Sequence, residues 1–278
     1  MEKSNKLELG SVQETLVIPL WVRAFETQKD KPLLIDNQAV SLVNSIPYDF
    51  TGFEQMSRSF FWRVIANGTI GRYIYCDNKL NAFIDSYPEA TVVNIGCGLD
   101  TTFYRVDNGK IQWLDLDLPD VIDLRKEYFP EKERNRLISK SVFDTSWYDI
   151  IENKDNVMLL MVGVIYFFDE SQIKRLFKDF QTYLPGAEMV FDVGSKLMAK
   201  TFNRKVKKEG RSARIIWSNS NIHKIERWNY GLEVIDSISA YNKNGRDYPF
   251  LHRIVMSVFE TFKLLAMAHV KIHPPQDS

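Results

Sequence analysis

The chain has 278 residues, 45% of them hydrophobic and 13% aromatic, which is enough to bury a large core in one α/β domain or in two small ones. Lysine plus arginine and aspartate plus glutamate each total 36, so the net charge is zero. Non-specific nucleic-acid binding needs a strong basic field, which this balance excludes. We therefore expect a folded protein that acts on a small molecule and has no nucleic-acid partner.

The cysteines and the apolar runs bear on the cellular compartment. Cys76 and Cys97 form no Cys-x-x-Cys pair, which fits a reducing cytosol. The N-terminal MEKSNKLELG lacks the apolar core of a signal peptide, and the longest apolar run, residues 157–168, is too short to span a bilayer. These features predict a soluble cytoplasmic protein without a membrane partner.

The chain begins with helical patterns and no strand signal. Residues 11–28 have apolar side chains at helical spacing, with Ser11 as the expected N-cap and Pro19 as an interruption. Residues 38–44 and 53–67 predict two further short helices. Helices this short seldom form a core of their own, so they predict a cap or lid over the domain that follows.

From residue 69 onward, helices and strands alternate. Residues 69–86 predict an amphipathic helix, and Val92, Val93 and Ile95 predict the first buried strand. The remaining strands are expected at 112–116, 137–142, 157–162, 188–193, 232–239 and 267–272, with helices at 120–128, 170–183 and 250–265. This order predicts an α/β fold with a mostly parallel sheet and an antiparallel last strand. Residues 1–88 would then form the cap with the first core helix, and residues 89–278 the core.

A basic segment interrupts the second half of the chain. Residues 200–214, KTFNRKVKKEGRSAR, carry little apolar periodicity. A solvated helix face or a mobile loop is one interpretation, and a lid that attracts an anionic substrate is the other. Residues 195–230 are accordingly a candidate lid-like insertion.

The stretch TVVNIGCGLDT, residues 91–101, is the most distinctive local motif. Gly96 and Gly98 follow a buried strand and allow a tight turn with exposed backbone N–H groups, which suits a nucleotide. A dinucleotide fingerprint would place a third glycine where this chain has Thr101. These residues alone therefore leave an ordinary strand-to-helix turn equally open.

Carboxylates follow the second strand. Asp117 lies 19 residues beyond Gly98, a distance at which a carboxylate can accept hydrogen bonds from both hydroxyls of an adenosine ribose. Asp115 is a weaker candidate for the same role. Asp117 could alternatively cap the helix that starts near Asp120.

Two other side chains could complete a nucleotide site. Asp144, after the third strand, could contact an adenine amino group or simply form an Asx turn. Arg72, on the helix before the first strand, could bind an anionic part of the ligand or be a surface charge. The four histidines lack metal-ligand spacing, so we expect no metal. Without a nucleophile elbow or a phosphate loop, a transferase or an oxidoreductase remains.

Longer motifs make the sequence recognisable. The runs NIGCGLDTTFYR, WLDLDLPDVIDLRK, VFDTSWYD, GVIYFFDESQI and MVFDVGSK resemble the leucine carboxyl methyltransferase superfamily. ETLVIPLWVRAFETQ and IERWNYGL are most similar to its branch related to the tetracenomycin polyketide O-methyltransferase. The resemblance spans nearly the whole chain. It implies a Rossmann-like class I methyltransferase fold with S-adenosylmethionine as cofactor and S-adenosylhomocysteine as its product.

The resemblance also implies a set of cofactor-binding residues around the glycine turn. Arg72 would pair with the methionine carboxylate, Asp117 would hold the ribose, and Asp144 would contact the adenine. The other implied contacts are Arg23 on the N-terminal helix that reaches over the site, Gly96, Gly98 and Gly163. Relatives often have glutamate where this chain has Val162, so the partner of the methionine amino group is open, and backbone carbonyls near Gly96 are one alternative.

We expect methyl transfer by in-line displacement to an oxygen of a small molecule, a carboxylate or a phenolic hydroxyl of a polyketide-like or other secondary metabolite. A carboxylate is ionised near neutral pH and needs no base, whereas a phenol would benefit from one. Tyr166, Asp192 and His223 are weak candidates for that base, so no catalytic residue is assigned. The alternatives are methylation of a protein C-terminal leucine, a nicotinamide-dependent oxidoreductase, and a cofactor-binding protein without turnover.

Overall fold

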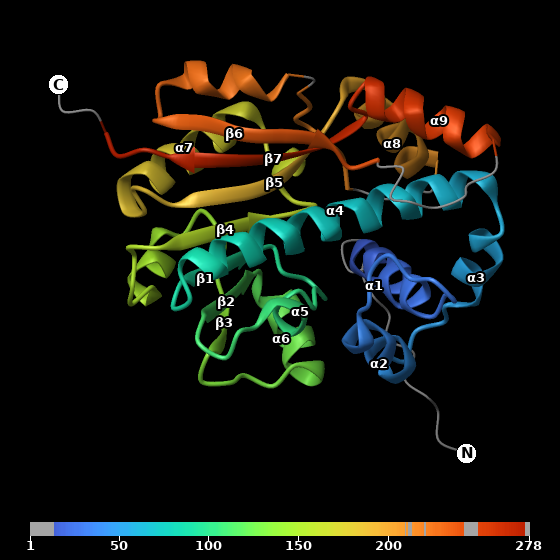
Figure 1. Ribbon diagram of the computed structural model, residues 1–278, viewed down its shortest axis with the longest axis horizontal. Helices are drawn as coiled ribbons and strands as arrows, with labels where there is room; N and C mark the ends of the chain where they lie inside the picture. Colours follow the sequence, from blue (N-terminus) through green and yellow to red (C-terminus); the bar gives the residue numbers. More distant parts are fainter. Residues whose placement is uncertain (1–13, 209, 211–212, 220, 242–249, 276–278) are drawn as a thin grey trace.

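A single mixed sheet forms the centre of the computed structural model, which describes residues 14–208, 210, 213–219, 221–241 and 250–275 (Figure 1). Its strands are β1 (Thr91–Ile95), β2 (Gln112–Asp117), β3 (Asn135–Ser139), β4 (Val157–Met161), β5 (Glu188–Gly194), β6 (Leu232–Ser239) and β7 (Leu265–Ile272). Their order is β3-β2-β1-β4-β5-β7-β6. Neighbours from β3 to β5 are parallel, and β7 is antiparallel to both β5 and β6. The predicted sheet with its antiparallel last strand is confirmed.

Helices cover both faces of the sheet. They are α1 (Glu14–Thr27), α2 (Asn37–Ser45), α3 (Thr51–Ser57), α4 (Phe60–Ser86), α5 (Phe103–Val106), α6 (Pro119–Tyr128), α7 (Glu170–Tyr183), α8 (Lys196–Lys208) and α9 (Phe250–Thr261), with short 3-10 turns η1 (Thr145–Ile150), η2 (Ile165–Phe167) and η3 (Ile222–Trp228). One face packs against α4, α5 and α9, and the other against α7 and the three 3-10 turns. Figure 1 shows α4 crossing in front of the strands. Among the described helices, none is both long and apolar enough to cross a membrane.

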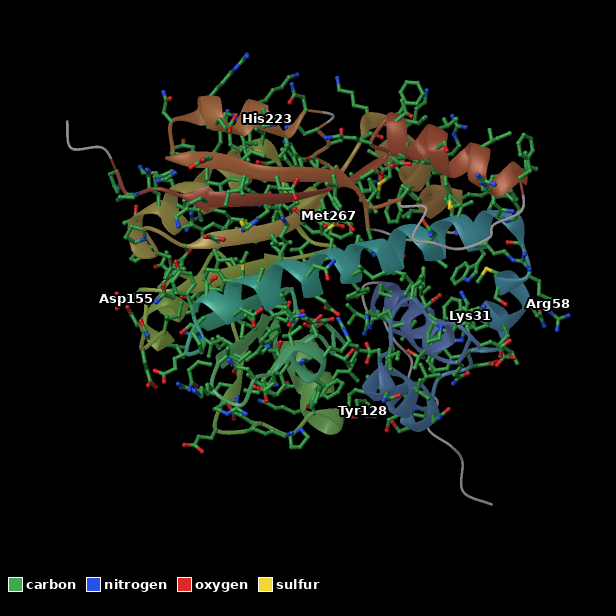
Figure 2. All side chains as sticks on the ribbon, in the orientation of Figure 1. Lys31, Arg58, Tyr128, Asp155, His223 and Met267 are labelled. Carbon is green, nitrogen blue, oxygen red and sulfur yellow. The ribbon has the colours of Figure 1, made fainter. Side chains whose placement is uncertain are left out.

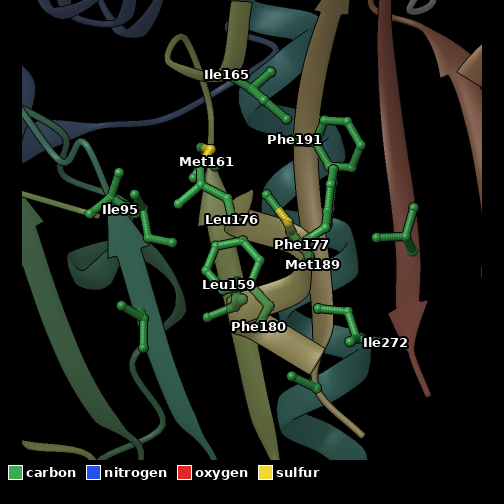
Figure 3. Packing of buried hydrophobic residues seen from close by; sticks show 14 of the residues in the cluster. Ile95, Leu159, Met161, Ile165, Leu176, Phe177, Phe180, Met189, Phe191 and Ile272 are labelled. Carbon is green, nitrogen blue, oxygen red and sulfur yellow. The ribbon is translucent and has the colours of Figure 1, made fainter. Parts of the chain in front are cut away.

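Helix α7 illustrates how the sequence builds these layers. Asp169 begins the helix with a capping box, in which its side chain accepts the backbone N–H of Gln172 at 2.9 Å. The buried face recurs at helical spacing through Ile173, Leu176, Phe177 and Phe180. Figure 3 shows this face against Leu159 of β4 and Met189 of β5. Burial of each such side chain stabilises the fold by about 1.5–3 kcal/mol.

Helix α4 differs from the prediction, which placed a boundary between two helices at Gly68. The break lies earlier, at Ser59, whose side chain caps the start of α4. Gly68 and Gly71 lie inside the helix, where a Cβ would come within 2.7 Å of the Tyr241 ring and 1.9 Å of the Ala240 carbonyl oxygen. These glycines mark the close approach of α4 to the end of β6, a tertiary contact that local sequence does not report.

Other boundaries also shift. The third strand ends at Ser139 rather than at residue 142, and α1 continues through Pro19. The first part of the basic segment, residues 200–208, belongs to α8, and α9 ends at Thr261 before a left-handed turn at Lys263 (φ 42°). The expected N-cap, Ser11, lies outside the described residues.

The N-terminal helices pack onto the sheet domain through one apolar cluster. Trp21 of α1 stacks on Phe25 with ring centroids 4.7 Å apart and meets Trp62 of α4 edge-on at 5.7 Å. The same cluster includes Leu99 beside the glycine turn and Leu124 of α6. The helices that precede the sheet therefore lie directly against the end of β1.

Candidate functional site

The glycine turn after β1 has the geometry that only glycine adopts readily. Gly96 and Gly98 have φ angles of 67° and 46°. The Gly96 N–H donates to the Leu116 carbonyl of β2 at 2.7 Å, which fixes the turn against the neighbouring strand. A Cβ would lie 2.3 Å from Val164 Cγ2 at the first glycine and 2.8 Å from Leu16 Cδ2 at the second. Side chains from α1 and from the segment after β4 therefore lie directly over the turn.

Asp117, at the end of β2, meets the glycine turn. Its carboxylate accepts the Gly98 N–H at 2.8 Å and the Leu118 N–H at 2.8 Å. Burial raises the pKa of this carboxyl, although the two N–H donors partly offset the shift. Asp117 does not cap α6, the alternative role that the sequence left open, because the N-cap residue of that helix is Leu118. The two residues that the spacing rule linked are hydrogen-bonded to each other.

Asp115, the weaker ribose candidate, has a different task. Its side chain is fully buried and binds the Arg125 Nη2 at 2.7 Å, the Trp113 indole N–H at 2.9 Å and the Asn94 amide at 3.0 Å. Arg125 Nη1 in turn donates to the Gly98 carbonyl at 2.9 Å. This pair ties α6 to the glycine turn from beneath.

Arg72 forms a second cluster where β4 and β5 end. Its Nη1 lies 2.8 Å from Asp192 Oδ2, and the other Asp192 oxygen accepts the Gly163 N–H at 2.7 Å. Burial would lower the pKa of Arg72, but the facing Asp192 carboxylate together with Tyr166 and Tyr73 raises the pKa, so the guanidinium stays charged. Its Nε is buried without a hydrogen-bond partner among the described residues. Gly163, at φ 83°, lies beside Arg72 and the Tyr166 hydroxyl.

Arg23 belongs to a third cluster, in which each guanidinium nitrogen of Arg23 has a hydrogen-bond partner in the protein. Its Nε binds Asp36 at 2.9 Å, its Nη2 donates to the Leu99 carbonyl at 2.8 Å, and its Nη1 donates to the Tyr73 hydroxyl. Arg105 reaches the same Asp36 oxygen at 2.7 Å. The arginine predicted to reach over the cofactor thus joins α1, the start of α2, α4 and the glycine turn.

Sequence reasoning missed the acidic members of this third cluster. Asp36 also caps α2 by accepting the Ala39 N–H at 2.9 Å, and it accepts the Thr101 hydroxyl at 2.5 Å. Arg105 forms a two-bond pair with Asp77 of α4, at 2.7 and 2.9 Å. The run Asp-Thr-Thr-x-Tyr-Arg was the sequence signal for this cluster, because its Thr101 and Arg105 side chains both donate hydrogen bonds to Asp36.

Asp144 and His223 lie apart from these clusters. The Asp144 carboxylate, 47% exposed, accepts the Ser146 N–H at 3.0 Å and so forms the Asx turn that opens η1. His223 is exposed in η3 and faces Glu226 at 3.1 Å. Figure 2 shows it beside β6, the sheet edge that β7, β5 and β4 separate from β1.

Nucleophile and metal chemistry find little support among the described residues. Cys97, between the two turn glycines, is buried, and burial raises the pKa of its thiol well above the usual range. It fills space as a neutral thiol. The described part of the chain contains no group of three histidine, cysteine or acidic side chains placed to hold a metal.

The residues around the turn fit S-adenosylmethionine. Asp117 offers a carboxylate for a ribose, the glycines allow the backbone to approach a ligand closely, and Arg72 offers a buried cation with an unused donor for a carboxylate. These groups meet at the carboxyl ends of β1, β2, β4 and β5. Ligands of open α/β sheets bind outside this edge.

Comparisons with known proteins show that the chain is similar to methyltransferases. A sequence model of the family described as leucine carboxyl methyltransferase matches residues 17–181. The tetracenomycin polyketide synthesis O-methyltransferase TcmP of Streptomyces glaucescens is 28% identical over 187 residues, which cover 67% of this chain and 67% of that protein. The S-adenosyl-L-methionine-dependent methyltransferase dpfgK of Gibberella zeae is 24% identical, over 94% of this chain and 93% of that protein.

Two solved structures share the fold. One is a candidate methyltransferase of Thermobifida fusca, with a TM-score of 0.57, 13% identity, and 91% of this chain and 94% of that one covered. The other is a DUF574 family protein of Streptomyces avermitilis, with a TM-score of 0.57, 13% identity, and 94% and 97% coverage. The class I methyltransferase fold is therefore confirmed. Since the matching residues 17–181 make up more than half of the sequence, the chain belongs to the leucine carboxyl methyltransferase family of S-adenosylmethionine-dependent methyltransferases.

Proposed function

We propose that the protein transfers a methyl group from S-adenosylmethionine to an oxygen of a small molecule, a carboxylate or a phenolic hydroxyl of a polyketide-like or other secondary metabolite. The observation that carries the proposal is the hydrogen bond between Gly98 and Asp117, which joins the glycine turn to a carboxylate at the sheet edge. Family membership and the O-methyltransferase activity named for the relative TcmP support it.

The residues of this chain would mainly hold and orient the reactants. S-adenosylmethionine, when bound, supplies an electrophilic methyl group on a sulfonium. Asp117 would accept the ribose hydroxyls, and Arg72 would pair with the methionine carboxylate. Leu16 and Val164, the apolar side chains over the turn, would keep water away from the reacting atoms. Alignment and dry surroundings are what an in-line displacement needs most.

The three candidate bases favour a carboxylate acceptor over a phenol. Both Asp192 oxygens already accept hydrogen bonds, from Arg72 and from Gly163. Burial, with the nearby Asp192 charge, raises the pKa of Tyr166, which therefore stays protonated at neutral pH. His223 lies beside the far sheet edge. A carboxylate is ionised without help, so it suits a site in which none of these three candidates is placed to act as a base.

A methyl-transfer screen tests the proposal. Purified protein would be incubated with methyl-labelled S-adenosylmethionine and with aromatic carboxylic acids, phenols and a peptide ending in leucine. We expect label in a base-labile ester of a small acid, abolished by Asp117→Ala and unchanged by Asp107→Ala, which removes an exposed carboxylate paired with Arg134. Transfer to the leucine peptide alone would replace the small-molecule acceptor by a protein.

Calorimetry distinguishes the remaining alternatives. We expect S-adenosylhomocysteine to bind and NADH not to bind. Tight NADH binding without S-adenosylhomocysteine binding would show a nicotinamide-dependent oxidoreductase. S-adenosylhomocysteine binding with no transfer to any acceptor would show a cofactor-binding protein without turnover.

A further inference from the structure

The ion pair between Arg72 and Asp192 has the composition that complements an α-amino-acid head group. The guanidinium and the carboxylate are 2.8 Å apart, and Asp192 is fully buried while the Arg72 side chain is 11% exposed. An α-amino acid carries an ammonium and a carboxylate on one carbon, so it presents the same two charges with opposite signs. Such a zwitterion can exchange partners with the pair and leave no charge unpaired.

We propose that Asp192 is the specificity-determining residue that binds the ammonium group of the cofactor's methionine portion, while Arg72 binds its carboxylate. This inference rests on the proposed function. A buried ammonium without an anionic partner costs several kcal/mol, so the site needs an acceptor of negative charge. The Val162 side chain at the end of β4 cannot accept a hydrogen bond.

The strand register places Asp192 next to that position. Met161 of β4 pairs with Phe191 of β5 in a parallel ladder, so the following residues, Val162 and Asp192, lie side by side on adjacent strands. Adjacent strands are about 4.8 Å apart. A carboxylate on β5 can therefore serve the same end of the sheet as one on β4.

The hydrogen bonds around Asp192 are consistent with an exchange of partners. The Gly163 N–H donates to Oδ1 at 2.7 Å and fixes the carboxylate, while Oδ2 accepts from the Arg72 guanidinium at 2.8 Å. The buried Arg72 Nε, without a partner among the described residues, is a donor that a ligand carboxylate would satisfy. Turning the guanidinium toward that carboxylate would free Oδ2 for an ammonium.

The test compares two ligands that differ only in the amino group. Calorimetry would measure S-adenosylhomocysteine and its deaminated analogue, 5′-S-(3-carboxypropyl)-5′-thioadenosine, on the wild type, on Asp192→Asn and on Glu188→Gln. Glu188 is a matched control on the same face of β5, paired with His269 at 2.8 Å. We expect the wild type and Glu188→Gln to prefer the amino ligand by about tenfold or more. Asp192→Asn should bind both ligands within about twofold of each other.

Each other outcome overturns the inference. A preference that survives Asp192→Asn would assign the ammonium to backbone carbonyls near Gly96. An equal loss of both ligands would give Asp192 a structural role only. A wild type without any preference would refute the inference before any variant is made, which covers the case in which Asp192→Asn does not fold. Failure of the proposed function is distinct, because the wild type would then bind neither ligand.

A rescue variant sharpens the result. Adding Val162→Glu to Asp192→Asn puts a carboxylate on the adjacent strand. We expect the preference for the amino ligand to return to at least about fivefold, because an ionised partner is again within reach of the ammonium. Persistence of equal binding in a double variant that melts like the single variant would count against recognition of the ammonium at this end of the sheet.

Discussion

Two buried arginines near the glycine turn, Arg23 and Arg72, differ in saturation, that is, in how many of their guanidinium nitrogens have a hydrogen-bond partner in the protein. Arg23 donates to Asp36, Leu99 and Tyr73, so each of its three nitrogens has a protein partner. Arg72 faces one carboxylate, Asp192, and keeps a buried Nε without a partner in the described part of the chain. Both residues were predicted to bind the cofactor. We infer from the contrast that the Arg23 cluster docks the N-terminal helices and that the Arg72–Asp192 pair binds the ligand.

The physical reason lies in the cost of buried charge. A buried ion pair contributes little net stability compared with apolar packing, but removal of one partner costs about 3–5 kcal/mol because the other charge is left alone. Asp36 holds two guanidinium groups, so it is the member whose loss leaves most charge unpaired.

The largest effect should therefore come from Asp36→Ala. This change leaves the buried Arg23 without its ion-pair partner, removes one of the carboxylates that Arg105 binds, and deletes the N-cap of α2. The free energy of unfolding should therefore fall by about 3–5 kcal/mol. Urea denaturation would measure it. Asp36→Asn, which can keep the cap, should lose less. If the folded fraction of Asp36→Ala bound S-adenosylhomocysteine at least tenfold more weakly, the cluster would be part of the ligand site instead.

The pH dependence of the free energy of unfolding tests the same Asp36 cluster in a second way. Burial alone would raise the pKa of Asp36, but Arg23 and Arg105 outweigh it, and the pKa is lowered. The ionised carboxylate therefore stabilises the fold above its unfolded pKa of about 3.9, and that stability is lost as the pH falls through the lowered value. The wild type should lose more stability than Asp36→Asn when the pH is taken from about 5 to about 2.

A matched pair of substitutions tests the contrast directly. Arg72→Lys keeps the charge but loses the planar fork, so S-adenosylhomocysteine affinity should fall about ten- to hundredfold with a small change in melting temperature. Arg23→Lys should do the reverse: it loses about 2–3 kcal/mol of stability, because two hydrogen bonds go, and keeps its affinity within about threefold. Equal affinity losses in both variants would remove the distinction.

Asp117→Asn should lower the affinity for the ligand with little effect on the free energy of unfolding. Since burial raises the pKa of Asp117, its ionised form opposes folding at pH 7, and this burden disappears as the pH falls below the unfolded value. The asparagine variant removes this burden but keeps an acceptor for only one of the two N–H groups, so its stability at pH 7 should stay within about 1 kcal/mol of the wild type, and it should bind S-adenosylhomocysteine about tenfold more weakly. Wild-type affinity should drop with acid through the raised pKa, and the variant's affinity should stay flat. A clear loss of stability at pH 7 would make Asp117 structural.

Local pattern was enough for most of the fold and for the turn. Alternation of strands and helices predicted the sheet, and the spacing rule singled out Gly98 and Asp117, which the structure joins by a hydrogen bond. Both are short-range consequences of strand geometry. The boundary near Gly68 was wrong because glycine there serves a contact with Tyr241, far along the chain.

Sequence could not predict which charged groups would saturate one another. Asp36, Asp77 and Arg105 come from segments without a shared local pattern, and only packing of α1, α2 and α4 onto the turn brings them together. The family resemblance alone suggested Arg23 as a ligand contact, and that role stays a prediction. The degree of saturation of a buried charge is a tertiary property, and it is what separates Arg23 from Arg72.

The smallest effect concerns Asp144, which belongs to neither arginine cluster and is open to solvent. Its lowered pKa arises from hydrogen bonds with Ser146 and, secondarily, from Lys140, so an Asx turn already accounts for its local geometry. If Asp144 also accepts the adenine amino group, the wild type should prefer S-adenosylhomocysteine over S-inosylhomocysteine, which has a carbonyl at that position, by about threefold, and Asp144→Ala should lose that preference. Calorimetry with both ligands would measure it, and Asp149→Ala in the same 3-10 turn is the control. A preference that persists in Asp144→Ala would mean that the carboxylate only shapes the turn, and the adenine would then be read by the backbone after β3.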